Sequence, residues 1–158
     1  MTSHRIGLGV DAHAFEDGAP LVLGGVRFDH PRGLAGHSDG DVIAHALIDA
    51  LLGAAGIGDI GALFPSDAST PRGIDSLDLL RDAAARVREA GFALVNADCV
   101  LIGEEPRIAE RRGDMETALS AVAGGPVSVR ATTTDGLGFT GRGDGLAAQA
   151  VALLEKTS

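Results

Sequence analysis

The segment Asp41–Ala55 most limits how this chain can fold. Its apolar residues surround the predicted helix on almost every side, so the helix must be largely buried between other elements. The polar side chains are those of Asp41, His45 and Asp49, which are four residues apart and form one stripe on one face. Because buried carboxylates and imidazoles need partners, this stripe predicts that other polar groups of the chain meet it.

The expected partners lie near the N-terminus. Asp11 and His13 are two residues apart in an apolar stretch that predicts a strand, so their side chains point to the same face. With His45 they supply one carboxylate and two imidazoles, a ligand set that leaves the fourth position of zinc or a similar ion open to water or substrate. The Asp49 carboxylate is expected to orient His45 without binding the metal itself, as carboxylates often do for metal-bound imidazoles. In the alternative interpretation, Asp41 only caps the helix and His45 is a satisfied core histidine.

His37 and Ser38 lie just before this helix, where free backbone N–H groups and the helix dipole favour an anion. An imidazole here can hydrogen-bond a phosphate. Ser38 can also cap the helix, with Asp41 three residues later, and the two roles are compatible. His4 and His30 are interpreted as surface residues without a function.

A second polar cluster begins with Thr132–Thr134, at the end of a predicted strand, and continues through Asp135 into a glycine-rich loop with Arg142. Threonine hydroxyls and loop N–H groups can hold phosphate oxygens, and Asp135 can hold a hard cation such as Mg²⁺ or Mn²⁺ that also contacts a diphosphate. The alternative is a strand end with a capped turn, and the Walker pattern is absent. A third element, Glu104–Arg107, would by itself be interpreted as a solvated loop.

Composition narrows the possible functions. The formal net charge of −9 argues against nonspecific binding of nucleic acid, and with 3% aromatic residues and no Trp or Tyr the stacking platforms for single strands are missing. No run approaches about 18 uncharged apolar residues, so no membrane span is expected. The polar N-terminus and the single Cys99, expected to be a buried inert thiol, make a cytoplasmic location the default.

The predicted elements indicate an α+β or α/β sandwich, one domain over residues 1–158, with helices on one face of a sheet. Strands are predicted at 5–10, 21–23, 26–28, 92–102 and 127–131, and helices at 41–55, 76–90, 107–123 and 145–156. Gly24-Gly25 indicates a hairpin turn, and Gly91 ends the helix that precedes it.

Several short motifs follow one another along the chain: Gly9–His13, His37–Asp41, Asp49–Ala54, Gly58–Gly61, Leu63–Pro65 and Thr132–Gly143. Together, and in this order, they resemble the family of 2-C-methyl-D-erythritol 2,4-cyclodiphosphate synthases, enzymes of the non-mevalonate isoprenoid pathway. The resemblance extends over nearly the whole chain, and the combination of motifs makes it specific.

The resemblance implies a reaction. The substrate is 4-diphosphocytidyl-2-C-methyl-D-erythritol 2-phosphate, whose 2-phosphate attacks the β-phosphate of the cytidine diphosphate to form the cyclic diphosphate and release CMP. This intramolecular phosphoryl transfer, catalysed by a phosphorus–oxygen lyase, requires positioning and charge neutralisation but no covalent nucleophile. The resemblance also implies a ferredoxin-like α/β sandwich, assembled as a homotrimer with active sites between subunits.

The resemblance also assigns roles to residues. His37 and Thr133 match positions that contact phosphate and stabilise the transition state, and Asp135 matches the ligand of Mg²⁺ or Mn²⁺ at the diphosphate. Asp11, His13 and His45 match the positions of the family's zinc ligands. The implied positions for binding substrate, or for the conduit at the trimer axis, are Ser38, Asp59, Gly61, Phe64, Asp67, Gly103, Pro106, Arg107, Ala131, Thr132, Thr134, Phe139 and Arg142.

The chain departs from the usual family pattern at three places. Asp135 stands where the family usually has Glu, Arg107 stands where it often has Lys, and Ser66-Asp67-Ala68 replaces a run with one or two acids. Two other functions fit the residues. A metal-dependent phosphohydrolase would activate water at the open position, and a nucleotide- or diphosphate-binding module would bind without turnover. The presence of both clusters together favours the cyclase.

Overall fold

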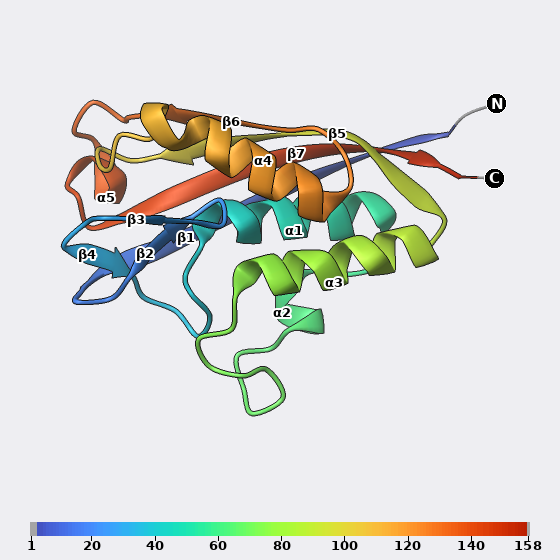
Figure 1. Ribbon diagram of the computed structural model, residues 1–158, viewed down its shortest axis with the longest axis horizontal. Coiled ribbons are helices and arrows are strands. Elements are labelled where there is room, and N and C mark those ends of the chain that lie inside the picture. The colour runs from blue at the N-terminus through green and yellow to red at the C-terminus, as the bar shows by residue number, and fades with distance from the viewer. Residues whose placement is uncertain (1–2, 158) are drawn as a thin grey trace.

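A computed structural model describes residues 3–157, and its centre is a mixed five-stranded sheet (Figure 1). In spatial order the strands are β4 (Arg32–Leu34), β1 (His4–Asp17), β7 (Gly145–Lys156), β5 (Phe92–Ile102) and β6 (Val127–Thr132). Only the pair β5–β6 is parallel among these described strands. The predicted hairpin forms outside the main sheet, from β2 (Leu21–Leu23) and β3 (Val26–Phe28).

The helices cover one face of this sheet (Figure 1). The layer consists of α1 (Val42–Ala55), α3 (Ser76–Glu89) and α4 (Arg112–Ala123), whereas the short helices α2 (Ile60–Leu63) and α5 (Gly138–Gly141) lie beside α1 and at the end of the sheet. The helix α1 packs directly on β1 and β7, and α3 packs on the outer side of α1. The prediction of an α+β fold with helices on one face of a sheet is therefore confirmed. Among the described residues, none of the helices combines the length and the apolar character needed to cross a bilayer.

The helix α1 is buried around nearly its whole circumference, as its sequence predicts. The sheet covers one side of it and α3 covers the other. Close contact with β1 depends on two glycines, because a Cβ atom at Gly7 would lie 1.8 Å from the carbonyl oxygen of Ala50, and one at Gly9 equally close to that of Ala46. The same face of β1 continues through Asp11 and His13, so both point toward α1.

This close approach makes Gly9→Ala a destabilising substitution. The backbone of α1 would have to move away from β1, and we expect a loss of about 3 kcal/mol in the free energy of unfolding, the upper range for overpacking. Gly53→Ala in α1 is the matched control, since nothing lies within 4 Å of an added Cβ there. We expect the control to stabilise by about 0.5 kcal/mol or more through helix propensity. Urea unfolding of both variants measures the difference, and an unchanged midpoint for Gly9→Ala would contradict the close packing.

The largest difference from the sequence prediction concerns residues 145–156, which form β7 instead of a closing helix. Buried and exposed residues largely alternate along β7, and the strand pairs with β1 on one side and β5 on the other. Hydrogen bonds to a strand on each side and burial against α1 outweigh the helix propensity of its alanines and leucines. Its small side chains allow α1 to lie close to the sheet.

Other boundaries shift less. The first strand continues to Asp17, so Asp11 and His13 lie inside it, and the strand predicted at 127–131 gains Thr132. The helix predicted from residue 107 begins only at Arg112, after a 3₁₀ turn at Ala109–Arg111. The strand 92–102 and both strands of the hairpin have the predicted bounds.

Candidate metal centre

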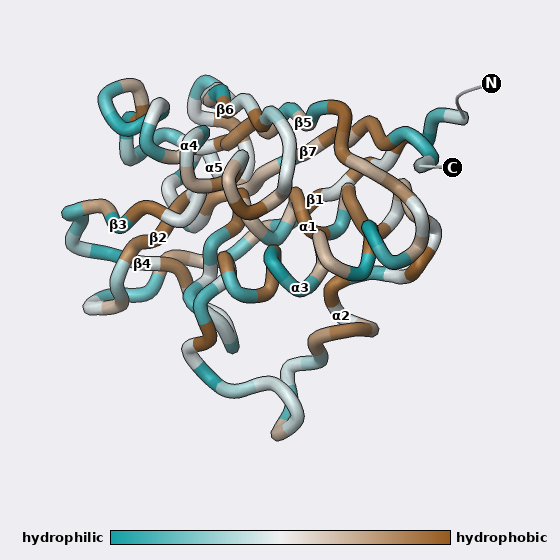
Figure 2. The backbone as a smooth tube through the Cα atoms, turned by 45° about the vertical axis from the view of Figure 1, so that its right-hand side comes forward, coloured by the Kyte–Doolittle hydropathy of each residue, from teal (hydrophilic) through white to brown (hydrophobic). Residues whose placement is uncertain are grey.

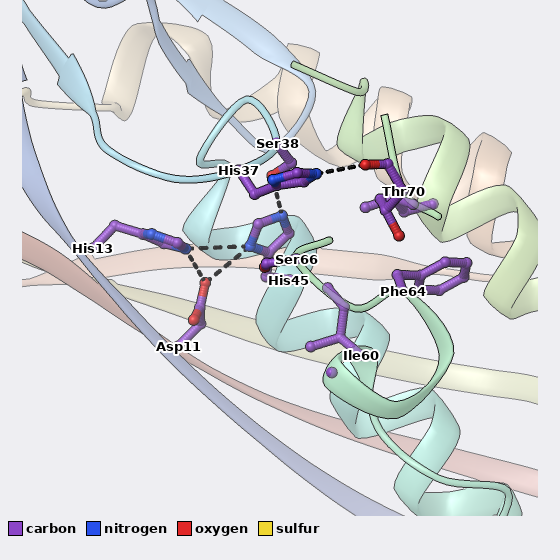
Figure 3. Close-up of a pocket in the computed structure, with 11 residues that line it drawn as sticks. Asp11, His13, His37, Ser38, His45, Ile60, Phe64, Ser66 and Thr70 are labelled. Atoms are coloured by element: carbon purple, nitrogen blue, oxygen red, sulfur yellow. Dashed lines mark hydrogen bonds and ion pairs between the residues drawn. The ribbon is translucent and has the colours of Figure 1, made fainter. Parts of the chain in front are cut away.

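Three side chains from β1 and α1 converge at the base of a pocket (Figure 3). The Asp11 Oδ2 atom lies 2.8 Å from His13 Nε2 and 3.1 Å from His45 Nδ1, and the two imidazole nitrogens are 3.3 Å apart. The chemistry of this donor set, two imidazole nitrogens and one carboxylate oxygen facing one point, fits a three-ligand site for zinc or a similar divalent ion. The structure thus brings together the predicted ligands.

The electrostatics keep the carboxylate ready for a cation. Burial raises the pKa of Asp11, but hydrogen bonds from His13 and His45, together with their positive charge, outweigh burial and lower this pKa to about 2. The hydrogen bond to Asp11 is also the main cause that raises the pKa of His13, against the opposing effect of burial. Asp11 is therefore ionised at neutral pH, as a metal ligand must be.

The three polar residues of the stripe, Asp41, His45 and Asp49, have different roles. Asp41 is fully buried and caps α1: its carboxylate accepts hydrogen bonds from the backbone N–H groups of Ala44, Gly24 and Gly25 at 3.1, 2.9 and 2.7 Å. Burial, and then the nearby carboxylate of Asp39, raises its pKa to about 6 in spite of these bonds. The capping interpretation of Asp41 is confirmed, and this carboxylate also fastens the β2–β3 hairpin to the helix.

Two other predictions about this helix are wrong. Ser38 is not the N-cap, because Asp41 occupies that position; the Ser38 Oγ instead lies 3.0 Å from His45 Nε2. Asp49 does not orient His45: its Oδ1 accepts the backbone N–H of Ile60 at 2.7 Å and so fixes the start of α2. The position behind the His45 ring is occupied by the hydroxyls of Ser38 and Ser76. The stripe alone could not reveal this, because both serines come from outside the helix.

Asp11, His13 and His45, the three candidate metal ligands, form the floor of a pocket of about 190 Å³. Its lining residues are Asp11, His13, His37, Ser38, His45, Ile60, Gly61, Phe64, Ser66, Thr70 and Leu79. Four of the other predicted site residues, His37, Ser38, Gly61 and Phe64, thus line the same pocket as the candidate ligands. The His37 Nε2 atom lies 2.5 Å from the carbonyl oxygen of Thr70. Asp59 caps α2 through a bond from the Ala62 N–H at 2.7 Å.

The segment between α2 and α3 forms one side of this pocket. It projects from the body of the molecule, and most of it has the pale teal colour of weakly hydrophilic residues (Figure 2). Phe64, Ser66 and Thr70 line the pocket from this segment (Figure 3). Asp67 is exposed and faces its own turn, where its Oδ1 accepts bonds from the Ser69 hydroxyl at 2.6 Å and backbone N–H at 2.8 Å. These bonds lower the pKa of Asp67.

The predicted nucleotide residues gather at a second pocket, of about 270 Å³, where β5 and β6 end. It is lined by Gly103, Glu104, Pro106, Arg107, Ile108, Ala109, Arg112, Ala131, Thr132 and Thr133. The Gly103 N–H donates to the Thr132 carbonyl at 3.0 Å and joins the two strand ends. Thr133 and Asp135 contact each other at 3.3 Å between Oγ1 and Oδ1. Arg112 and Ile108 are lining residues that the sequence analysis did not single out.

Four predicted residues of the segment from Thr132 to Gly143 line neither pocket: Thr134, Asp135, Phe139 and Arg142. Thr134 bonds within its own loop, to the Leu137 carbonyl at 2.6 Å. Phe139 is 43% exposed. Arg142 is exposed, pairs with Asp144 at 3.0 Å, and borders a further hollow of about 170 Å³.

One histidine differs from its interpretation as a surface residue. The His30 side chain is only 11% exposed, its Nδ1 lies 2.9 Å from the Arg32 carbonyl, and its ring stacks on Phe15 with 5.9 Å between centroids. Cys99, in contrast, is buried as predicted, and burial is the main cause that raises its pKa to about 12.

Fold and site together define an α+β protein with a three-ligand candidate metal centre and a separate second pocket at the ends of β5 and β6. Comparison with known proteins identifies the particular kind. The chain belongs to the YgbB family, whose model matches residues 4–155.

Relatives match over their whole length or over one part. The 2-C-methyl-D-erythritol 2,4-cyclodiphosphate synthase of Rubrobacter xylanophilus is 56% identical over 162 residues, which cover 99% of this chain and 98% of that protein. The solved structure of IspF from Plasmodium falciparum in complex with CDP has a TM-score of 0.85 and 31% identity, covering 99% of this chain and 98% of that one. The bifunctional IspDF from Campylobacter jejuni has a TM-score of 0.95 and 38% identity, covering 100% of this chain and 44% of that one.

Proposed function

We propose that this chain is a 2-C-methyl-D-erythritol 2,4-cyclodiphosphate synthase, a phosphorus–oxygen lyase that cyclises 4-diphosphocytidyl-2-C-methyl-D-erythritol 2-phosphate and releases CMP. The observation that carries the proposal is the convergence of Asp11, His13 and His45 at the floor of a pocket that His37 also lines. Relatives that carry this name, two of them 56% and 50% identical over nearly the full chain, support the same reaction.

The metal pocket binds the erythritol part of the substrate together with its 2-phosphate, which is the group that attacks. Asp11, His13 and His45 would hold zinc, which would supply positive charge next to a phosphate oxygen. The His37 imidazole, at the pocket wall, stabilises charge on the phosphates once it leaves the Thr70 carbonyl. The groups proposed to position the erythritol and its phosphate are Ser38, Asp59, Gly61, Phe64 and Asp67.

The second pocket serves the cytidine diphosphate. Its size of about 270 Å³ and the two arginines in its lining, Arg107 and Arg112, suit a nucleotide diphosphate held between the ends of β5 and β6, and a relative is solved with CDP. Thr133 contacts the phosphates, and Asp135 holds Mg²⁺ or Mn²⁺ at the diphosphate. The residues proposed to bind the nucleotide are Gly103, Pro106, Arg107, Ala131, Thr132 and Thr134.

We further propose that residues 1–158 form one domain of ferredoxin-like type and that three copies assemble. The face of the sheet opposite the helices carries exposed apolar side chains, namely Ile6, Leu8 and Val10 on β1 and Val151 on β7, which are 46–75% exposed. A contiguous apolar face of this kind is typical of an interface. Assembly through it would bring the metal pocket of one subunit to the nucleotide pocket of the next, with Phe139 and Arg142 near the axis.

The reaction is tested by phosphorus NMR of the purified protein with the cytidine-diphosphate substrate, with and without a chelator. We expect CMP and a cyclic diphosphate to appear only when metal is present. Free phosphate with open-chain products would favour a phosphohydrolase, and an unchanged spectrum with added Zn²⁺ and Mg²⁺ would favour a binding module.

The role of Asp135 can be tested separately. Its φ of 52° is a left-handed conformation that asparagine tolerates, so Asp135→Asn removes the charge without straining the loop. We expect the Mg²⁺ concentration for half-maximal turnover to rise by about tenfold, because a hard cation loses a charged ligand. Zinc content should stay the same. Asp114→Asn, at an exposed carboxylate on α4, is the control. An unchanged Mg²⁺ dependence in Asp135→Asn would make this residue only part of the turn.

A further inference from the structure

A buried serine and a carboxylate lie behind the metal ligand His45. Ser76, the first residue of α3, is completely buried. Its hydroxyl lies 2.8 Å from His45 Nε2 and donates to Asp39 Oδ1 at 2.5 Å. Its backbone N–H donates to Asp39 Oδ2 at 2.9 Å. Asp39 therefore holds Ser76 at two points, and Ser76 contacts the ring nitrogen that points away from Asp11.

The supply of protons determines the direction of these bonds. A serine hydroxyl has a single proton, and an ionised carboxylate can only accept. Because the Ser76 hydroxyl donates its hydrogen bond to Asp39, its oxygen must accept a hydrogen bond from the N–H of His45 Nε2. In the metal-bound state the imidazole is then the Nε2–H tautomer, and the lone pair of Nδ1, the atom that otherwise hydrogen-bonds Asp11 Oδ2 at 3.1 Å, faces the ion.

We propose that Asp39 and Ser76 are positioning residues that hold His45 in the rotation and tautomer needed to bind a metal through Nδ1. The inference rests on the proposed function only in taking Asp11, His13 and His45 as the metal centre. Outer contacts of this kind orient ligand imidazoles and raise their affinity for metal. The Ser38 hydroxyl, 3.0 Å from the same Nε2, lines the pocket and accepts the Gly40 N–H at 3.3 Å, so it is a secondary partner.

The same groups connect the metal ligand to the projecting segment. The Asp39 N–H donates to the Ile74 carbonyl at 3.2 Å, and the Gly73 N–H donates to the His37 carbonyl at 2.7 Å. The end of the segment between α2 and α3 is thus paired with residues 37–39. The location of Ser76 behind His45 depends on this pairing. Gly73 and Ile74, which precede Ser76, are bonded to residues 37–39, and Asp39 of that segment accepts the hydrogen bond of the Ser76 hydroxyl.

The test is the affinity of the purified full chain for Zn²⁺, measured by competition with a chelating dye. We expect Ser76→Ala and Asp39→Asn each to weaken zinc binding by about 10- to 100-fold. The double variant should be no weaker than the weaker single variant, because both substitutions break one chain of hydrogen bonds. Ser128→Ala is the matched control: its hydroxyl also donates to a carboxylate, Asp98 Oδ1 at 3.0 Å, on the exposed part of the sheet. It should bind zinc like the wild type.

A spectroscopic measurement separates positioning from general stability. In the zinc-loaded wild type, NMR should detect the His45 Nε2 proton in slow exchange with water, and Ser76→Ala should lose this signal while the backbone spectrum stays folded. Should Asp39→Asn fail to fold, Ser76→Ala decides alone, because it leaves the backbone bond to Asp39. Equal zinc affinity and an unchanged proton signal in Ser76→Ala would overturn the inference while leaving the reaction intact. A wild type that binds no zinc would overturn both the inference and the metal centre.

Discussion

We expect His45→Ala to lose its stoichiometric zinc and to lower turnover by on the order of 10³-fold, the scale of losing a principal charge stabiliser in phosphoryl transfer. His45 supplies one of three ligand atoms, and the Nδ1 position next to Asp11 Oδ2 cannot be replaced by another side chain of the pocket. The fold should persist. We expect the free energy of unfolding to fall by about 1–3 kcal/mol, because the Ser76 hydroxyl and Asp11 each lose one hydrogen-bond partner.

Metal content by atomic absorption, turnover by CMP release and thermal unfolding measure the three effects. His30→Ala is the matched control, since His30 is another mostly buried histidine with a backbone hydrogen bond, to the Arg32 carbonyl. It should lose stability but keep its zinc. Normal zinc content in His45→Ala would remove this histidine from the metal centre and revive its interpretation as a core residue.

The second large effect is expected from Leu8→Asp. Leu8 is 64% exposed at the middle of β1, opposite Val151 in the sheet register. A carboxylate there costs the isolated subunit little. In the proposed trimer it would be buried among apolar side chains, where an unpaired charge is costly enough to separate the subunits. Turnover should disappear with the trimer, because the metal pocket and the nucleotide pocket would no longer meet.

Sedimentation velocity at micromolar concentration, together with turnover, tests this expectation. Ala121→Asp places the same charge at an exposed position of α4, on the helical face, and should leave the assembly and the turnover unchanged. Circular dichroism should show that Leu8→Asp stays folded. A wild type that sediments as a stable monomer and is fully active would contradict the shared site, and so would an active monomeric Leu8→Asp.

Local patterns in the sequence were sufficient for much of the fold and for the centre of the site. The apolar run of 41–55 required a buried helix, and Gly24-Gly25 required a turn. The Asp-x-His spacing placed two ligands on one face of a strand. These features are encoded within a few residues, because helix and strand periodicities and turn conformations depend on near neighbours.

Contacts between distant segments decided the rest. Residues 145–156 have the composition of a helix but become β7, because β1 and β5 offer hydrogen bonds on both sides. The stripe on α1 suggested Asp49 as the partner of His45, yet Ser76 occupies that position from a helix that begins 27 residues after Asp49. The sequence by itself thus determined which side chains can bind a metal, whereas tertiary structure alone decided which groups stand behind them. The physical reason is that a hydrogen bond across the fold depends on where two separate elements pack, which no local pattern records.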